Sequence, residues 1–132
     1  MTGTTVTDGL SAAILVPADP AALVLVRLFA TAIGREADLE EEDVEDLKLA
    51  LTEVCSAAIE AAAGDHDEVR VEVRWSADPV ELEVHVVSSS RFSTGDPGSS
   101  HRAGLLYALG VELRRTDDGR EVAFAPTLGE SA

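Results

Sequence analysis

Residues 42–63 constrain the fold more than any other stretch, because they form the longest segment with one regular hydrophobic period. Its apolar residues recur in steps of three and four, which keeps them in one stripe along a helix of 3.6 residues per turn. The stripe consists of Val44, Leu47, Leu51, Val54, Ala58 and Ala62, widened by Leu49 and Ile59. The segment therefore predicts a long helix that packs against a sheet or a second helix.

The ends of this helix are also marked in the sequence. Acidic residues at 40–43 oppose the positive end of the helix dipole, and Gly64 suits the left-handed conformation that often ends a helix. Beside the apolar stripe, Glu53, Ala57 and Glu60 align at i, i+4 and i+7. A glutamate on this face is either a general base or a solvated side chain, and from spacing alone the solvated side chain is the commoner case.

Two later segments alternate apolar and polar residues with the period of a strand. Residues 68–76 and 80–87 are separated by Asp78-Pro79, so they predict a hairpin with one face toward a core. The expected inward-facing residues are Val69, Val71, Val73 and Trp75 on the first strand, and Val80, Leu82, Val84 and Val86 on the second.

The remaining elements are shorter. A strand is expected within 11–17, followed by a helix that starts at Asp19-Pro20, ends at Gly34 and buries Leu23, Val26, Leu28 and Ile33. The polar segment 88–100 is either a functional loop or a plain connector. A short helix at 101–109, capped by Ser99 or Ser100, precedes a hairpin of 111–115 and 121–125 around a D-D-G turn.

This order of elements favours an α+β fold: a two-layer sandwich with a mostly antiparallel sheet and about three helices on one face. We expect one domain over residues 12–126, with flexible termini at 1–11 and 127–132. A chain of 132 residues suits a single core.

Composition excludes several function classes. The net charge of −15 disfavours nucleic-acid binding, which requires clustered basic residues, and favours basic protein partners. Neither a membrane-spanning run nor a signal peptide is evident, so we expect a cytoplasmic protein with no membrane partner. The single Cys55 is expected to be a small core residue, and the three scattered histidines lack the spacing of a zinc site.

Two segments carry a family resemblance. DLKLALTEVCSAAIEAA at 46–62 and RAGLLYALGVELRRTDDGREVAF at 102–124, in this order of elements, resemble the anti-sigma-factor serine kinases of the Bergerat (histidine-kinase-like) ATPase fold. The family's helix pattern is roughly D-x-x-L/K-A-x-x-E-A-x-x-N-A. At matching places this chain has Asp46, Leu49, Ala50, Glu53, Cys55 and Ala58. The resemblance covers about residues 12–125 and implies the corresponding fold.

The resemblance also implies roles for individual positions. Glu53 would be the general base, while Ala57 stands where the family has the asparagine that holds Mg²⁺, so no metal ligand is expected there. The family's Asp-x-Gly-x-Gly box, whose aspartate binds adenine, reads Ser88-Ser89-Ser90-Arg91-Phe92 here. The candidate nucleotide contacts that remain are Ser88, Ser90, Arg102, Gly104 and Leu105.

Three interpretations stay open at the level of sequence. The first is an anti-sigma-like regulator that binds a sigma factor or a STAS-type anti-anti-sigma protein, with weak or no ATP binding and no expected cofactor. The second is an active serine/threonine kinase that uses ATP and Mg²⁺ to phosphorylate a STAS antagonist. The third is a small interaction domain that shares only the fold. Members of the family often dimerise, so the resemblance also implies a possible homodimer.

Overall fold

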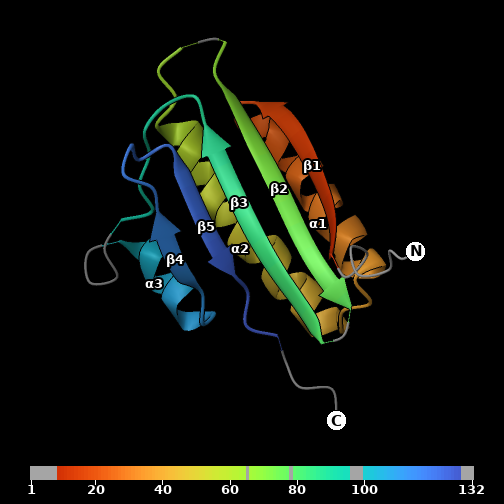
Figure 1. The fold of residues 1–132 in the computed structure, drawn as a ribbon. Helices are drawn as coiled ribbons and strands as arrows, with labels where there is room; N and C mark the ends of the chain where they lie inside the picture. Colours follow the sequence, from red (N-terminus) through yellow and green to blue (C-terminus); the bar gives the residue numbers. More distant parts are fainter. Residues whose placement is uncertain (1–8, 65, 78, 96–99, 129–132) are drawn as a thin grey trace.

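The computed structural model describes residues 9–64, 66–77, 79–95 and 100–128, and these form two layers (Figure 1). The elements, in chain order, are β1 (Gly9–Pro17), the 3-10 turn η2 (Pro20–Ala22), α1 (Leu23–Glu36), α2 (Glu41–Glu60), β2 (Glu68–Ala77), β3 (Val80–Ser88), α3 (His101–Ala108), β4 (Glu112–Arg115) and β5 (Glu121–Ala125). The predicted α+β order is therefore confirmed.

The sheet has five antiparallel strands in the order β1-β2-β3-β5-β4. The predicted central hairpin is confirmed, with Val71 opposite Val86 and Val73 opposite Val84. Strict alternation in both strands sends these valines to one face, and a shift of one residue would turn every one of them to the solvent. The last hairpin is confirmed as well, and Gly119 adopts the positive φ of 71° that its tight turn requires.

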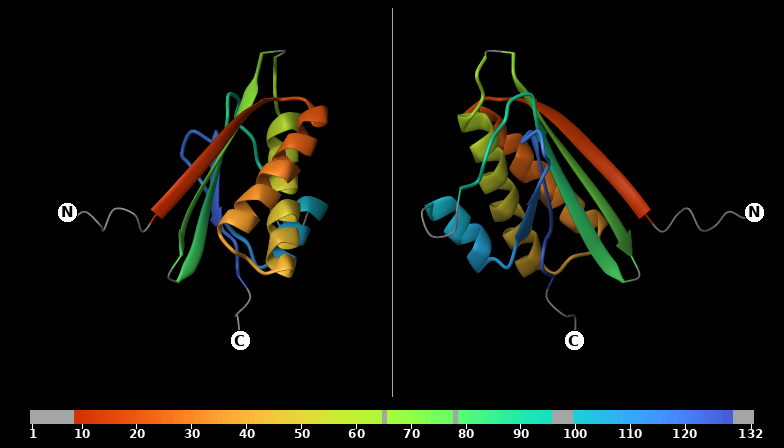
Figure 2. Two further views of the ribbon diagram at one scale, coloured as in Figure 1. Left: turned by 90° about the vertical axis from the view of Figure 1, so that its right-hand side faces the viewer. Right: turned by 60° about the vertical axis from the view of Figure 1, so that its left-hand side comes forward.

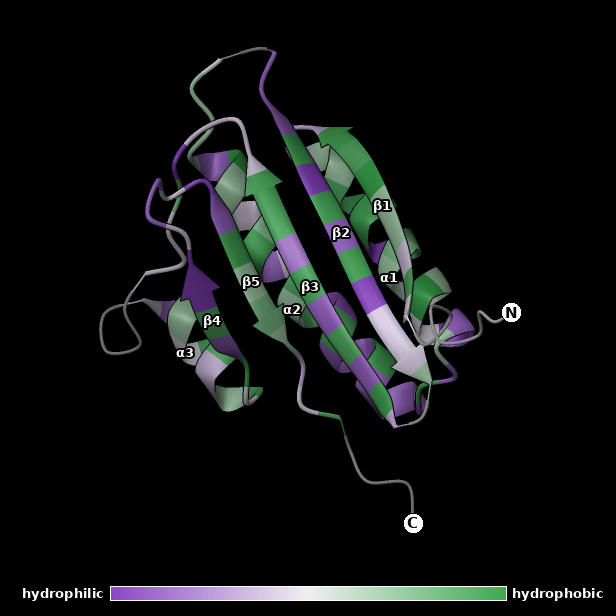
Figure 3. Cartoon of the chain, in the orientation of Figure 1, coloured by the Kyte–Doolittle hydropathy of each residue, from purple (hydrophilic) through white to green (hydrophobic). Residues whose placement is uncertain are grey.

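Helices α1 and α2 cover one face of the sheet, and α3 lies on the same side next to α2 (Figure 2). The opposite face carries no helix in the described part of the chain, so its strands follow the half-buried pattern seen as colour alternation in Figure 3. On that open face, the central strands β2 and β3 present charged residues such as Arg70, Glu72 and Glu83. His85 on this face lies between two carboxylates: its Nε2 is 2.6 Å from Glu83 Oε1, and its Nδ1 is 2.7 Å from Glu121 Oε2.

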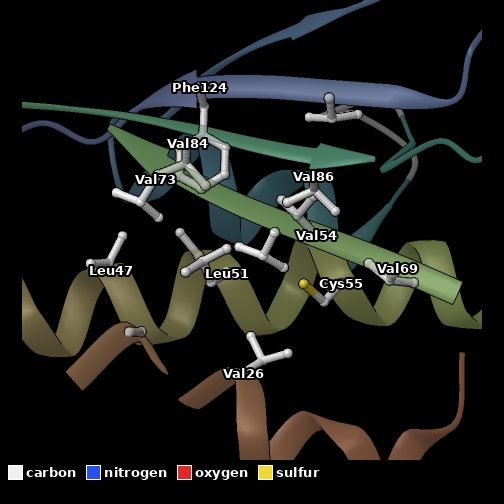
Figure 4. Close-up of a cluster of buried hydrophobic side chains, with 14 of the residues drawn as sticks. Val26, Leu47, Leu51, Val54, Cys55, Val69, Val73, Val84, Val86 and Phe124 are labelled. Carbon is white, nitrogen blue, oxygen red and sulfur yellow. The ribbon is translucent and has the colours of Figure 1, made fainter. Parts of the chain in front are cut away.

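The core lies between α2 and the sheet (Figure 4). Leu47, Leu51 and Val54 of α2 are fully buried against Val84 and Phe124 of the sheet, among others. Cys55 is also fully buried, which confirms it as a core residue, and burial raises the pKa of its thiol to about 12. Since a thiol with this pKa stays protonated at neutral pH, Cys55 is unreactive as a nucleophile.

Helix α2 differs from its prediction at its C-terminal end. It begins at Glu41, as the acidic cluster indicated, but it ends at Glu60 with Ala61 as its C-cap. Gly64 does not adopt a positive φ and does not end the helix; the backbone N–H groups of Ala63 and Gly64 instead point to Asp67 Oδ2. Leu49 is 39% exposed, because it lies on the flank of the stripe that the sheet does not reach.

The first helix corrects two predictions. Asp19 does cap the start, since its Oδ1 accepts a hydrogen bond from Ala21 N, but that first turn is a 3-10 turn. Gly34 does not end the helix, which continues to Glu36; Gly34 is buried where α1 meets Val44 of α2. Leu28 is 62% exposed rather than buried, because only one side of α1 faces the molecule.

Strand β1 begins at Gly9, three residues before the predicted domain boundary at residue 12. The hydrogen-bonded register with β2 runs over its whole length, from Gly9 opposite Ser76 to Pro17 opposite Glu68. The first of the two segments predicted to be flexible, 1–11, therefore overlaps the sheet at residues 9–11. Residues 1–8 and 129–132 of these segments lie outside the described residues.

We predict that Gly34→Ala lowers the free energy of unfolding by about 1 kcal/mol. The added Cβ would lie 2.6 Å from Val44 Cγ2, and overpacking of this kind costs about 1–3 kcal/mol. The better helix propensity of alanine offsets about 1 kcal/mol of that cost. Urea denaturation of the wild type and the variant measures the difference.

Two further variants control this experiment. Gly9→Ala meets no atom within 4 Å, so its stability should stay within a few tenths of a kcal/mol of the wild type. In a double-mutant cycle, Val44→Ala should reduce the cost of Gly34→Ala. A Gly34→Ala protein as stable as the wild type would contradict the close approach of α1 to α2.

Candidate functional site

The predicted site residues lie on the second half of α2, on the start of α3, and on the end of β3 with the residues that follow it. On α2, Glu53 is partly buried, with 23% of its side chain exposed, whereas Glu60 is exposed. Ala57, one turn after Glu53, is 3% exposed. Glu53 and Glu60 share one face of α2 as the i, i+7 spacing predicted, because one side chain from α3 contacts both.

That side chain is Arg102. Its Nη2 lies 2.6 Å from Glu60 Oε2, and its Nε lies 3.5 Å from Glu53 Oε1. The contact with Glu60 is a hydrogen-bonded ion pair, whereas the buried Nε makes no hydrogen bond and meets Glu53 as a charge. The hydrogen bond from Arg102 lowers the pKa of Glu60, and the Glu60 carboxylate raises the pKa of Arg102.

The bridge fixes a positive charge beside the candidate base. A guanidinium stays protonated at every physiological pH, so Glu53 faces a permanent cation. Ala57 presents only a methyl group between the two glutamates along the helix, and a methyl group offers no oxygen to a hard cation. Among the residues that the structure describes, no group of three or more His, Cys, Asp or Glu side chains is arranged to hold a metal ion.

The segment of residues 88–92, called the serine segment, is tied to the protein by its own hydrogen bonds. Ser88 is buried at the end of β3, where its Oγ accepts a hydrogen bond from Ser90 N at 3.2 Å. Ser90 Oγ donates to Asp67 Oδ2 at 2.7 Å. This bond, with those from the Ala63 and Gly64 amides, lowers the pKa of Asp67. The two serines thus connect the end of β3 to the start of β2.

Asp67 and Phe92 are two residues of this region that the sequence analysis did not single out. Asp67 joins the end of α2 to the serine segment through the bonds above, and its place two residues after a Gly-Asp pair is typical of a turn. Phe92 is 3% exposed, and its backbone N–H donates to Gly119 O. A lone aromatic residue in a polar segment is the signal that could have identified it as a core anchor.

Helix α3 begins as predicted, with Ser100 Oγ accepting a hydrogen bond from Ala103 N at 3.1 Å. The amide of Gly104 already donates to Ser100 O within the first helical turn, so it is not free to bind a phosphate oxygen. Leu105 is half-buried on the same helix. The structure therefore brings Arg102 to Glu53, while Ser88, Ser90 and Gly104 form hydrogen bonds with residues of the protein itself.

Known proteins similar to this chain include two bacterial proteins named RsbW. A serine-protein kinase RsbW of Bacillus velezensis is 34% identical over 71 residues, which are 54% of this chain and 44% of that protein. An anti-sigma-F factor RsbW of Mycobacterium tuberculosis is 36% identical over 109 residues, 80% of this chain and 61% of the relative. The chain thus spans about half of the length of these curated relatives.

The match to a protein family covers the elements just described. Residues 16–103 match the histidine kinase-like ATPase domain. This range runs from the end of β1 to the start of α3. This match contains Glu53, Ala57, the serine segment and Arg102, and it agrees with the antiparallel sheet under three helices. The chain belongs to the family of histidine kinase-like ATPase domains.

Proposed function

We propose that this domain is an anti-sigma-type regulator that acts by binding other proteins, with weak or no binding of ATP. The observation that carries the proposal is the Arg102 bridge, in which a guanidinium contacts the candidate base Glu53 and its neighbour Glu60 across Ala57. The anti-sigma role rests on the similarity to the Mycobacterium tuberculosis relative, which is named an anti-sigma-F factor.

The bridge disfavours a metal ion at this place. Phosphoryl transfer depends on a metal that neutralises charge on the phosphates, and Mg²⁺ takes oxygen ligands in an octahedral arrangement. Ala57 supplies no such ligand, and a cation bound near Glu53 would meet the charge of Arg102. The residues present therefore do not fit a Mg²⁺-nucleotide.

The adenine side of the site also disfavours a nucleotide. Ser88 is neutral, and a hydrogen bond to a charged group is worth about 1.5–3 kcal/mol against about 1 kcal/mol for a neutral pair. Ser88 Oγ also already accepts a bond from Ser90 N. Phe92 occupies the core at a position where the family resemblance would place a glycine. These differences reduce the expected affinity for a purine.

The expected partners are a sigma factor, a STAS-type anti-anti-sigma protein, or both. One relative is named an anti-sigma-F factor, which supports the first partner class for this chain. The net charge of −15 fits basic partner surfaces, since complementary charge raises association rates. No helix in the described parts of the chain is long and apolar enough to cross a bilayer.

An active kinase is the second candidate, and two observations favour it. Glu53 is retained at a partly buried position on α2, and one relative is named a serine-protein kinase. On this alternative, Arg102 would leave Glu53 when nucleotide binds, and another residue would replace the oxygen ligand missing at Ala57.

We predict that millimolar ATP with Mg²⁺ leaves the Tm of the protein unchanged relative to Mg²⁺ alone. When the nucleotide concentration is below Kd, binding stabilises the native state by less than ~0.4 kcal/mol, which is within the error of a thermal scan. A clear rise in Tm, with transfer of radiolabel from ATP to a STAS protein, would establish the kinase instead.

We predict that Ala57→Asn combined with Ser88→Asp increases nucleotide binding at least tenfold, measured by isothermal titration with Mg²⁺-ATP. The asparagine adds an oxygen ligand and the aspartate adds a charged acceptor, each typically worth more than about 1 kcal/mol when the rest of a pocket is intact. The matched control is Ala61→Asn with Ser89→Asp. Ala61 lies one helical turn after Ala57, Ser89 lies one residue after Ser88, and both positions are exposed.

Folding of both double variants is checked first by circular dichroism, because Ala57 and Ser88 are buried. Equal binding by the wild type, the variant and the control would show that the affinity does not depend on these two side chains. That result would contradict the attribution of weak binding to Ala57 and Ser88.

We predict that Arg102→Gln destabilises the protein by no more than about 1 kcal/mol at pH 7, because Glu60 is solvent-exposed and the ion pair is screened. The pKa of Glu60 is lowered in the folded state, so its contribution is present at neutral pH and is lost as the pH falls below the ordinary value near 4.5. The difference between wild type and variant should therefore shrink in acid. Denaturation at pH 7 and pH 4 measures it, and a difference that grows in acid would contradict the ion pair.

A further inference from the structure

Two arginine side chains meet over the turn that joins β4 to β5. A Cβ on Gly119 would lie 2.9 Å from Arg115 Nη2 and 3.3 Å from Arg91 Cζ, so both guanidinium groups pack against this one glycine. Gly119 is buried, although residues 114–118 and Arg120 around it are exposed, because the two side chains cover it. We call the side chains of Arg91 and Arg115 the arginine pair.

The backbone beneath the arginine pair is fixed by hydrogen bonds. Phe92 N donates to Gly119 O at 2.9 Å, and Ser88 N donates to Arg120 O at 2.8 Å. The serine segment and the β4–β5 turn therefore lie side by side, where the chain leaves β3 (Figure 1). Phe92, which is 3% exposed, anchors the serine segment in the core. Residues on a backbone held in this way keep their geometry before a ligand binds.

The nearest carboxylate of the turn is bound elsewhere. Asp118 Oδ1 accepts hydrogen bonds from Thr116 Oγ1 at 2.7 Å and from Arg120 N at 3.1 Å. These two bonds, and after them the charges of Arg120 and Arg91, lower the pKa of Asp118. Among the residues that the structure describes, neither Arg91 nor Arg115 forms an ion pair with a carboxylate. The N–H groups of the arginine pair are therefore available to an anion.

The charge of the arginine pair indicates the class of its ligand. In a chain whose net charge is −15, two positive charges are held next to each other, and an anion between them removes their repulsion. A guanidinium group presents its N–H donors in a rigid plane that matches the oxygens of carboxylates and phosphates. A phosphate monoester carries nearly two negative charges at pH 7, so it matches two guanidinium groups better than a singly charged carboxylate does.

We propose that the arginine pair binds a phosphate group, either as free phosphate or as a phosphate monoester carried by another molecule. Arg115 contacts the phosphate oxygens from the end of β4, and Arg91 contacts them from the serine segment. The phosphate replaces water on both guanidinium groups, and no bond within the ligand is made or broken.

The phosphate site is independent of the proposed function. It does not use Arg102, which is paired with Glu53 and Glu60 of α2. Binding of phosphate is measured on the purified protein, in the absence of Mg²⁺, ATP and any sigma factor, so it succeeds or fails separately from the anti-sigma role.

The experiment is an NMR titration of isotope-labelled protein with inorganic phosphate at pH 7, with sodium chloride of equal ionic strength as the reference. Phosphate should produce saturable shifts of the Arg91, Arg115 and Gly119 amides that chloride does not produce. Arg91→Gln and Arg115→Gln should each raise the dissociation constant at least about fivefold, because each removes one of the two charged donors. Arg114→Gln is the matched control, since Arg114 is an exposed neighbour of Arg115 that pairs with Glu83 instead.

Two further probes define the ligand class. Acetate carries a single charge and should bind more weakly than phosphate at equal ionic strength. O-Phosphoserine with blocked amino and carboxyl groups carries the same phosphate as a monoester. Tighter binding of this probe than of inorganic phosphate identifies a phosphorylated molecule as the ligand, and the reverse identifies free phosphate.

The proposal is supported if both substitutions in the arginine pair weaken phosphate binding while Arg114→Gln leaves it unchanged. Circular dichroism establishes that the variants are folded. A wild type that responds to phosphate only as it responds to chloride overturns the proposal. An equal loss of binding in Arg114→Gln also overturns it, because such a loss would reflect net charge alone. Acetate that binds as tightly as phosphate contradicts the assigned ligand class.

Discussion

The packing of the α2 apolar stripe against the central hairpin is the interaction on which the rest of the structure depends. Fully buried residues of α2, such as Leu51 and Val54, meet the valine rows of β2 and β3, and α1 closes the other side through Val26. This contact fixes the rotation of α2 about its axis. Because the rotation is fixed, Glu53 and Glu60 must face α3, and the position of Arg102 follows from it.

The elements predicted correctly from the sequence are those in which a hydrophobic pattern repeats over many residues. Alternation in β2 and β3 and the helical period of α2 each rest on many residues, so single exceptions do not alter the pattern. Features that depend on one residue were predicted less well. Gly34 is the kind of residue that often ends a helix, but tertiary contact with Val44 keeps it inside α1, and Leu28 is exposed because the molecule covers α1 on one side only.

The candidate site shows the same division. The alignment of Glu53 with Glu60 follows from helical geometry, and the structure places them on one face. The Arg102 bridge to Glu60 spans 42 residues, and no local pattern encodes a contact of that separation. Likewise, the pairing of Ser90 with Asp67 follows only from the register of β2 and β3. Sequence similarity identifies the ATPase family, whereas these contacts show what the side chains at the candidate nucleotide-site positions bind in this chain.

The central claim is that a histidine kinase-like ATPase fold is retained here while Arg102, in place of a metal, pairs with Glu53 and Glu60 of α2. A crystal structure of the protein grown with Mg²⁺ and a non-hydrolysable ATP analogue tests this claim most directly. We expect Arg102 to stay within ion-pair distance of Glu53 and Glu60, with no ordered nucleotide bound. An ordered Mg²⁺-nucleotide next to the serine segment, with Arg102 moved away from Glu53, would contradict the claim.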